Sequence, residues 1–200
     1  MSYKKKKILC FVKCYLPGYK YGGPIRTIAN FVENFGEKFD IRIVCDDRDF
    51  LDTKPYKHIK INDWNKVGKA QVFYLSLRKL SLKSIKNLLK EFNYDLIYLN
   101  SFFTFKYTIL PIFLLWIKVL PQSPVVIAPR GEFSFSALKL KKLKKRLFIF
   151  IIKILGIYNN LYWQASSIFE KKDIINNFEK IPKKIYIAPN LVSTIVKDKK

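Results

Sequence analysis

Two glycines and a proline lie where a short apolar run gives way to an amphipathic segment. The stretch YLPGYKYGGPIRTI, residues 15 to 28, places Gly22, Gly23 and Pro24 directly before apolar residues at helical spacing. Backbone N–H groups at a helix start attract anions, and glycine allows a ligand to approach them closely. The stretch is therefore either a simple turn or a loop that faces an anion such as a phosphate. It lacks the G-x-G-x-x-G fingerprint, so a dinucleotide site is not indicated.

Three further groups of polar residues each follow a short apolar run. They are Asn100 with Ser101, then Arg130 with Gly131 and Glu132, and finally Asn190. Asn100 and Ser101 either cap the helix that follows or contact a ligand. In a purely structural role Arg130 would pair with a carboxylate, and Glu132 is a candidate for that partner. Glu170 has a simpler interpretation as a helix-capping residue, because Ser167-Ile168-Phe169-Glu170 has the capping-box pattern.

The apolar runs that precede these residues are predicted to be strands, with amphipathic segments between them. Strands are expected at 8–12, 41–45, 95–99, 125–128, 161–165 and 185–188, and helices at 25–35, 81–92, 105–119, 136–155 and from 167. Residues 59–75 are expected to form two strands of a hairpin-type insertion around Lys66, Val67 and Gly68. This alternation predicts an α/β fold with a Rossmann-like, doubly wound, mostly parallel sheet. Ligands bind beyond the carboxyl ends of such strands, so the polar groups are expected on one rim.

The net charge indicates what kind of partner the protein binds, and the cysteines indicate the redox state of its compartment. The 200 residues carry 38 Lys and Arg against 15 Asp and Glu, a net charge of +23, but only six of the cations are arginine. This favours anionic surroundings, such as a membrane face or phosphorylated ligands, over specific nucleic-acid readout. Cys10, Cys14 and Cys45 form no C-x-x-C motif. Cys10 and Cys45 lie in apolar runs and are expected to be buried free thiols, and Cys14, near the glycine loop, is expected to be inert. Such free thiols fit a reducing cytoplasm.

Two apolar stretches bear on membrane contact. Residues 102–121 are interrupted by Pro111 and have a charge-free core that is too short to cross a bilayer, so no transmembrane helix is predicted. The run KLKKLKKRLFIFIIK, residues 139–153, lies in a helix with Leu140, Leu143, Leu147, Phe150 and Ile154 at 3-4 spacing. Either this apolar stripe faces the sheet and the lysines are solvated, or the helix lies on an anionic lipid surface.

Five motifs, in order, resemble a known enzyme family. They are YxPxxxxGGP-x-R-T at the first helix, DLIYLNSFF, VVIAPRGEFSFSALKLKKLKKRL, WQASSIFEKKDI and IYIAPNLV. Together they resemble the N-terminal half of family 4 glycosyltransferases, which are retaining enzymes of the GT-B architecture. The resemblance covers almost the whole chain, and its third motif is the most specific.

The resemblance implies a nucleotide-sugar donor and a glycan or lipid-linked acceptor, used in surface polysaccharide assembly. On this basis Gly22, Gly23 and Pro24 contact donor or acceptor, as do Asn100, Ser101, Arg130, Gly131 and Glu132, with Asn190 at an interdomain hinge. Arg130 and the glycine N–H groups would stabilise the charge of the leaving nucleoside diphosphate. The nucleotide sugar is a co-substrate, and neither a cofactor nor a metal is expected.

Two departures from the family pattern limit what carries over. The sole histidine, His58, lies in the expected insertion, so no catalytic residue is assigned. The hinge motif reads PNLV where PNG-x-D is common in the family. The expected organisation is one acceptor-side domain over residues 1–190, the start of a linker over 191–200, and a donor-binding domain outside this sequence. The chain would then be inactive alone.

Two other functional interpretations remain open from the sequence. In the first, the chain is a non-catalytic acceptor- and membrane-binding subunit whose partner chain supplies the donor site. In the second, more remote one, it is a basic nucleic-acid-binding protein. Against the second, arginines are few, aromatic residues lie mostly in apolar runs, and no nucleic-acid-binding module is present. We therefore expect a cytoplasmic protein, with peripheral contact to the inner membrane face as an alternative.

Overall fold

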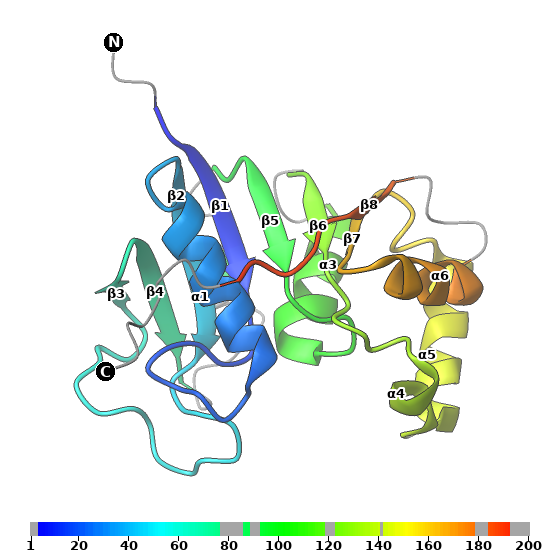
Figure 1. Cartoon of the computed structure of the whole chain (residues 1–200), viewed down its shortest axis with the longest axis horizontal. Helices are drawn as coiled ribbons and strands as arrows, with labels where there is room; N and C mark the ends of the chain where they lie inside the picture. The colour runs from blue at the N-terminus through cyan, green and yellow to red at the C-terminus, as the bar shows by residue number, and fades with distance from the viewer. Residues whose placement is uncertain are drawn as a thin grey trace. The chain divides into compact units, whose positions relative to one another are not determined.

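The chain folds into two compact units. A computed structural model describes residues 4–76, 86–88, 93–118, 123–140, 142–178 and 184–192. One unit comprises residues 1–80 together with 190–200, and the other comprises residues 81–189. Figure 1 shows strands interleaved with helices along the chain.

The first unit is built on three parallel strands and one antiparallel edge strand. The strands are β1 (Lys6–Phe11), β2 (Phe39–Asp46), β3 (Trp64–Val67) and β4 (Ala70–Leu75), in the spatial order β3-β4-β2-β1. Ile8 of β1 lies opposite Ile41 of β2. The helix α1 (Gly23–Phe35) buries Ile25, Ile28 and Val32, which recur at the spacing of one helix face.

The hairpin predicted for residues 59–75 is present, but it is not an insertion. Strands β3 and β4 pair antiparallel, with Gly68 at φ 56° in the turn between them. Strand β4 also pairs in parallel with β2, where Val72 lies opposite Ile43. The sequence VFYL is apolar on both faces, as expected for an internal strand, so β4 belongs to the sheet and only β3 lies outside the parallel series.

The second unit contains four consecutive parallel strands. They are β5 (Leu96–Leu99), β6 (Val125–Ile127), β7 (Tyr162–Ala165) and β8 (Ile185–Ile187), ordered along the sheet as in the sequence. The α-helices of this unit whose ends lie within the described residues are α3 (Leu110–Trp116), α4 (Phe135–Lys139), α5 (Lys142–Leu155) and α6 (Ile168–Asn177). Both units are thus α/β with mostly parallel strands, which confirms the predicted Rossmann-like, doubly wound fold.

Two expected helices of this unit are interrupted. Residues 105–119 begin with a π-helical turn, Phe105–Ile109, and continue as α3. Pro111 lacks an N–H and its ring crowds the carbonyl four residues earlier, which explains why one uniform α-helix does not form. The segment 136–155 is divided into α4 and α5, because Leu140 adopts an extended conformation. Of the helix predicted at 81–92, only residues 86–88 are described, and they are helical; the rest lies outside the described residues.

The core of the second unit is a cluster of aromatic rings centred on Phe102. The Phe102 side chain is fully buried, and its ring lies 4.6–6.0 Å, centroid to centroid, from six others: Phe103, Phe133, Phe148, Tyr158, Trp163 and Phe178. These rings come from the loops after β5 and β6, from α5, from the turn between α5 and β7, from β7, and from the residue that follows α6. The cluster therefore fixes the loops that carry Asn100, Ser101 and Glu132. Among the described residues, no helix combines the length and apolar character needed to cross a bilayer.

Candidate functional site

Three loops of the second unit meet at the carboxyl ends of their strands. Asn100 and Ser101 follow β5, Arg130 to Glu132 follow β6, and Glu170 belongs to the first turn of α6 after β7. Asn100 is 2% exposed, Ser101 6% and Glu170 5%. Such polar residues are rarely buried without hydrogen-bond partners, and here each has a partner in the loop after β6: Asn100 accepts from Arg130, Ser101 donates to Glu132, and Glu170 accepts from Gly131. The structure thus brings together five predicted site residues, Asn100, Ser101, Arg130, Gly131 and Glu132.

The guanidinium group of Arg130 is oriented by neutral groups of β5 and its loop. Its Nε donates to Oδ1 of Asn100 at 2.6 Å, and Nη2 donates to the hydroxyl of Tyr98. The Tyr98 hydroxyl donates in turn to Oε1 of Gln164 at 2.7 Å. The amide oxygen of Asn100 and the hydroxyl of Tyr98 are uncharged, so these two bonds orient the guanidinium without adding a negative charge. A cation held in this way is suited to an anionic ligand.

The backbone at Arg130 adopts a conformation that is unfavourable for its side chain. Arg130 has φ 57° and Gly131 has φ 76°, two successive residues in the left-handed region. For a residue other than glycine this costs on the order of 1 kcal/mol. The Gly131 N–H donates to Oε1 of Glu170 at 2.6 Å, and this bond helps to hold the turn. Such strain is characteristic of functional sites, where the surrounding structure imposes it.

Glu132 is not the partner of Arg130 that the sequence offered. One carboxylate oxygen accepts from Oγ of Ser101 at 3.0 Å, and the other accepts from the N–H groups of Phe102 at 2.7 Å and Phe103 at 2.9 Å. The carboxylate therefore ties the loop after β6 to the loop after β5. Both loops precede elements of the aromatic cluster, so Glu132 acts as a positioning residue between them.

Glu170 does more than cap its helix. The predicted cap is confirmed in part, because Oγ of Ser167 accepts from the Glu170 N–H at 3.2 Å. The carboxylate of Glu170, however, accepts from the N–H and Oγ of Ser166 at 2.7 and 2.5 Å, and from the Gly131 N–H. Sequence reasoning missed this link, because the Ser-x-x-Glu pattern already accounted for the residue.

The glycine loop belongs to the first unit and leads into α1 there. Gly22, with φ 67°, is the residue before the helix, and Pro24 stands within its first turn. The N–H of Gly22 donates to the carbonyl of Tyr19 at 3.0 Å, so it is used within the loop. Pro24 has no N–H, which leaves Gly23 and Ile25 as the first-turn donors that lack an intrahelical acceptor. The anion-facing interpretation therefore depends on these two groups and remains a prediction.

A buried carboxylate that the sequence analysis did not select holds the start of this loop. Oδ2 of Asp49 accepts from the N–H groups of Tyr19 at 2.7 Å and Lys20 at 3.0 Å, and Oδ1 accepts from the Phe50 N–H at 2.7 Å. Burial acts to raise the pKa of Asp49, but these N–H donations outweigh it and the pKa is lowered. An aspartate three residues after β2 in a basic chain was the only available signal.

Gly18 and Gly23 offer a matched pair of substitutions in the loop. A Cβ at Gly18 would lie 2.2 Å from the hydroxyl of Tyr56 and 2.9 Å from the carbonyl oxygen of Tyr15, whereas a Cβ at Gly23 would meet nothing within 4 Å. We expect Gly18→Ala to lower the free energy of unfolding by about 1–3 kcal/mol through overpacking. Gly23→Ala should change it by less than about 0.5 kcal/mol. Urea unfolding of both variants measures the difference, and equal stabilities would contradict this packing.

All three cysteines are buried and free, which confirms the burial predicted for Cys10 and Cys45. Burial raises the pKa of the Cys10 thiol to about 12 and, together with Asp46 and Asp49, raises that of Cys14 to about 12; the pKa of Cys45 is also raised by burial. We expect less than one thiol per chain to react with a disulfide reagent at pH 8 in the native protein, and all three in guanidinium chloride. Rapid reaction of Cys14 in the native protein would contradict its assignment as inert.

The same thiols predict a loss of stability in alkali. Their folded pKa values lie above the unfolded value near 8.5, so unfolding releases protons once the pH exceeds about 8.5. The free energy of unfolding should then fall by up to about 1.4 kcal/mol per pH unit for each thiol, until the pH passes the folded pKa near 12. Urea unfolding at pH 8 and pH 10 measures this slope. A Cys10→Ala variant should show a shallower slope if the thiols are the cause.

Asn190, a predicted site residue, and His58, the sole histidine, belong to the first unit. Asn190 follows β8 and is exposed. Next to it, the carbonyl of Leu191 accepts from Nδ2 of Asn30 on α1 at 2.7 Å, so this segment lies against α1 within the first unit. His58 is exposed in the segment between β2 and β3. Among the described residues no group of three His, Cys, Asp or Glu side chains is placed to hold a metal ion.

Comparisons with known proteins give no relative on which to base a role. No protein-family model matches the chain, and no curated protein matches it in a sequence search. The candidate site therefore rests on its own geometry and on the motif resemblance.

Proposed function

We propose that the chain is the acceptor-side portion of a retaining glycosyltransferase. It would take part in moving a sugar from a nucleotide-sugar donor to a glycan or lipid-linked acceptor in surface polysaccharide assembly. The observation that carries the proposal is the Arg130 group: a half-buried guanidinium at the carboxyl end of β6, oriented by Asn100 and Tyr98. It stands within the motif that most specifically resembles the family, and in the rim where parallel sheets bind ligands.

The chemistry of sugar transfer explains why such a cation is useful. Departure of a nucleoside diphosphate from the sugar builds negative charge on the leaving phosphate oxygen. A fixed guanidinium stabilises this charge without reorganising during the reaction. The nearby carboxylates of Glu132 and Glu170 would oppose binding of a phosphate if they faced it, but each accepts hydrogen bonds from backbone N–H groups of the loops. These bonds point the two carboxylates at the backbone of the loops, which they hold in position.

The test uses the endogenous polypeptide, isolated from its native cells with an antibody raised against residues 15–28. Its mass is measured first, and the isolated protein is then incubated with labelled UDP-, GDP-, ADP- and dTDP-sugars and with lipid and glycan fractions of the same cells. We expect label transfer from one donor class, with the anomeric configuration retained. Failure to transfer from every donor, in a preparation that still contains all its partner chains, would contradict the proposal.

The same experiment separates the one-chain enzyme from the split enzyme. Transfer by a single polypeptide much larger than 23.7 kDa would make the chain one domain of a complete transferase. Transfer by a 23.7 kDa polypeptide that is lost when a co-purifying chain is removed would make it the acceptor-side subunit.

A further inference from the structure

The apolar stripe of α5 faces solvent rather than the sheet. Its members are exposed by 44–84%: Leu143, Leu147, Phe150, Ile151 and Ile154. They recur at 3-4 spacing and, at about 100° per residue, fall on one side of the helix. We call these five residues the outer face of α5. Of the two interpretations left open by the sequence, packing of this stripe against the sheet is therefore wrong.

A different side of α5 anchors the helix to its unit. Ile149 and Ile152 are buried, and the Phe148 ring lies 6.0 Å from the ring of Phe102. Lys145 belongs to the same side: its Nζ donates to the carbonyl of Ala137 at 2.8 Å and lies 4.7 Å from the ring centroid of Phe103. At helical spacing these residues are opposite the outer face. The exposed stripe is thus additional apolar surface that the core does not use.

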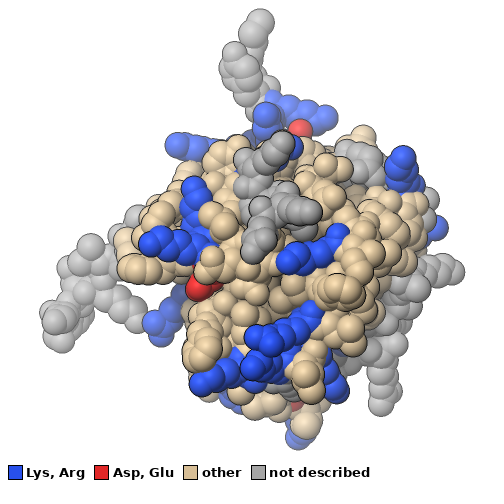
Figure 2. All heavy atoms as spheres, turned by 90° about the vertical axis from the view of Figure 1, so that its right-hand side faces the viewer, with Lys and Arg blue, Asp and Glu red and all other residues tan. Residues whose placement is uncertain are grey.

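Positive charges border the outer face on both sides. On a helical projection Lys142, Arg146 and Lys153 lie along one flank, and Lys144 lies along the other. No acidic residue occurs between Glu132 and Glu170, whereas seven Lys and Arg do. Figure 2 shows the corresponding side of the molecule, where blue side chains interrupt the neutral surface and little red is visible.

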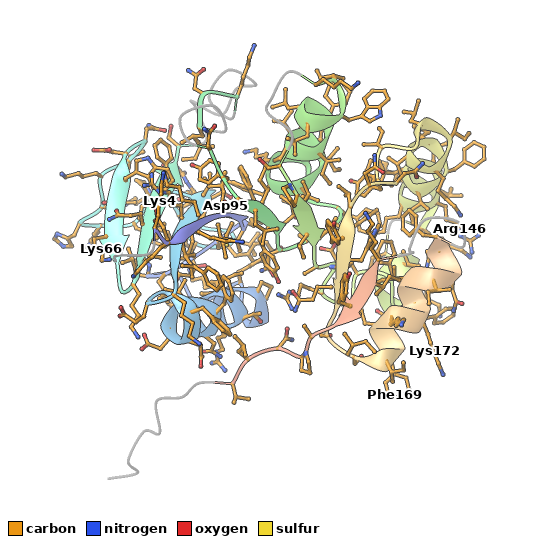
Figure 3. All side chains as sticks on the ribbon, turned by 90° about the horizontal axis from the view of Figure 1, so that it is seen from above. Lys4, Lys66, Asp95, Arg146, Phe169 and Lys172 are labelled. Carbon is orange, nitrogen blue, oxygen red and sulfur yellow. The ribbon has the colours of Figure 1, made fainter. Side chains whose placement is uncertain are left out.

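The helices α4 and α6 also carry exposed apolar side chains near lysines. In α4 and its end, Phe135 is 76% and Leu140 71% exposed, and Nζ of Lys139 lies 4.5 Å from the centroid of the Phe135 ring. On α6, Phe169 is 73% exposed. Figure 3 shows Phe169 and Lys172 projecting from α6, and Arg146 on α5. Apolar side chains flanked by lysines thus occur on three successive helices.

We propose that the outer face of α5 docks on an anionic lipid bilayer. Apolar side chains would enter the boundary between headgroups and acyl chains, while the flanking lysines contact anionic headgroups. A second copy of the chain fits this surface less well, because pairing two such faces would bring their cationic flanks together in a protein of net charge +23. The proposal concerns the surface alone and does not depend on the proposed transferase activity.

The apolar contribution is tested with vesicles and a matched pair of variants. The 200-residue chain is sedimented with vesicles of phosphatidylglycerol and phosphatidylcholine, or of phosphatidylcholine alone, at low salt. We expect strong binding to the anionic vesicles only, and a fall of about tenfold or more in Leu143→Ser/Leu147→Ser. Leu51→Ser is the control, because Leu51 is 85% exposed in the first unit. Its binding should equal that of the wild type.

A second pair of variants tests the electrostatic contribution to vesicle binding. Lys142→Gln/Lys144→Gln should weaken binding by about fivefold for each charge removed, and raised salt should weaken it in the wild type. Lys54→Gln/Lys57→Gln removes two exposed cations from the first unit and should have a much smaller effect. Circular dichroism and thermal unfolding verify that the variants fold, as expected for exposed positions.

Three results would overturn the proposal. The first is no sedimentation with purely anionic vesicles at low salt. The second is equal weakening by the α5 variants and their controls, which would indicate only a general attraction of a basic protein. The third is a dimer or larger assembly, seen by analytical ultracentrifugation, that dissociates in Leu143→Ser/Leu147→Ser. In that case the outer face would be a protein interface.

Discussion

Phe102→Ala is expected to lower the free energy of unfolding by about 3–5 kcal/mol, the usual cost of removing a buried phenylalanine ring. The Phe102 side chain is fully buried at the centre of six other aromatic rings. Its removal would leave a cavity that rings fixed on separate elements could fill only in part. Because the ring anchors the loop after β5 in the core, this loop should become less ordered at the same time, although the backbone N–H at position 102 can still donate to Glu132.

Urea unfolding followed by near-ultraviolet circular dichroism measures both effects. Phe135→Ala is the matched control, because the Phe135 side chain is 76% exposed and its removal should change stability by less than about 0.5 kcal/mol. A loss below about 1 kcal/mol in Phe102→Ala would show that the cluster does not hold the unit together. Phe102→Leu, which retains most of the apolar volume, should lie between the wild type and the alanine variant.

The sequence was informative about the strands and less so about where helices pack. Short apolar runs such as ILCFV and VVIA are compatible only with buried strands when helical segments separate them, and the structure confirms β1 and β6 there. Hydrophobic periodicity showed that residues 143–154 contain an apolar stripe. It could not show which side of α5 packs inward, because Ile149 and Ile152 supply a second apolar side.

The group of loops in the second unit was predictable in part of its membership but not in its connections. Residues after parallel strands must lie at one sheet edge, so Asn100, Ser101 and Arg130 could be selected from position alone. Which carboxylate meets which donor depends on loop conformation. Glu132 turns to Ser101 and not to its near neighbour Arg130, and Glu170 reaches Gly131, 39 residues away in the chain. No local pattern encodes contacts of this range.

The sequence also contained no pattern that predicts the positive φ angle at Arg130. Gly131 alone explains the Pro-Arg-Gly sequence as an ordinary turn, with the positive φ angle at the glycine. The structure places a positive φ angle at Arg130 as well. Among the described residues, four others besides the glycines also have a positive φ angle, so the backbone conformation alone does not assign a role to Arg130. The proposed role of its guanidinium is tested by substitution.

Arg130→Gly is expected to lower the transfer rate of the proposed transferase by about 10²–10³-fold in a protein that still folds. The loss in rate is that typical of removing one preorganised donor from a charge-stabilising site. The substitution also removes the hydrogen bonds to Asn100 and Tyr98, but it relieves the left-handed backbone cost at φ 57°. Hydrogen bonds to a charged group contribute about 1.5–3 kcal/mol each and the backbone relief about 1 kcal/mol, so the free energy of unfolding should fall by about 2 kcal/mol or more.

Two further variants distinguish charge stabilisation from a purely structural role. Arg130→Lys retains the charge but cannot reproduce the fork that meets Asn100 and Tyr98, so it should recover only a small part of the rate. Lys57→Gln removes an exposed cation of the first unit and should leave the rate unchanged. Steady-state kinetics with the identified donor, together with urea unfolding of the same preparations, gives both quantities. Arg130 would be a structural residue if Arg130→Gly lost several kcal/mol of stability but still transferred sugar at the normal rate. A guanidinium that stabilises the leaving nucleoside diphosphate cannot be removed without slowing the transfer.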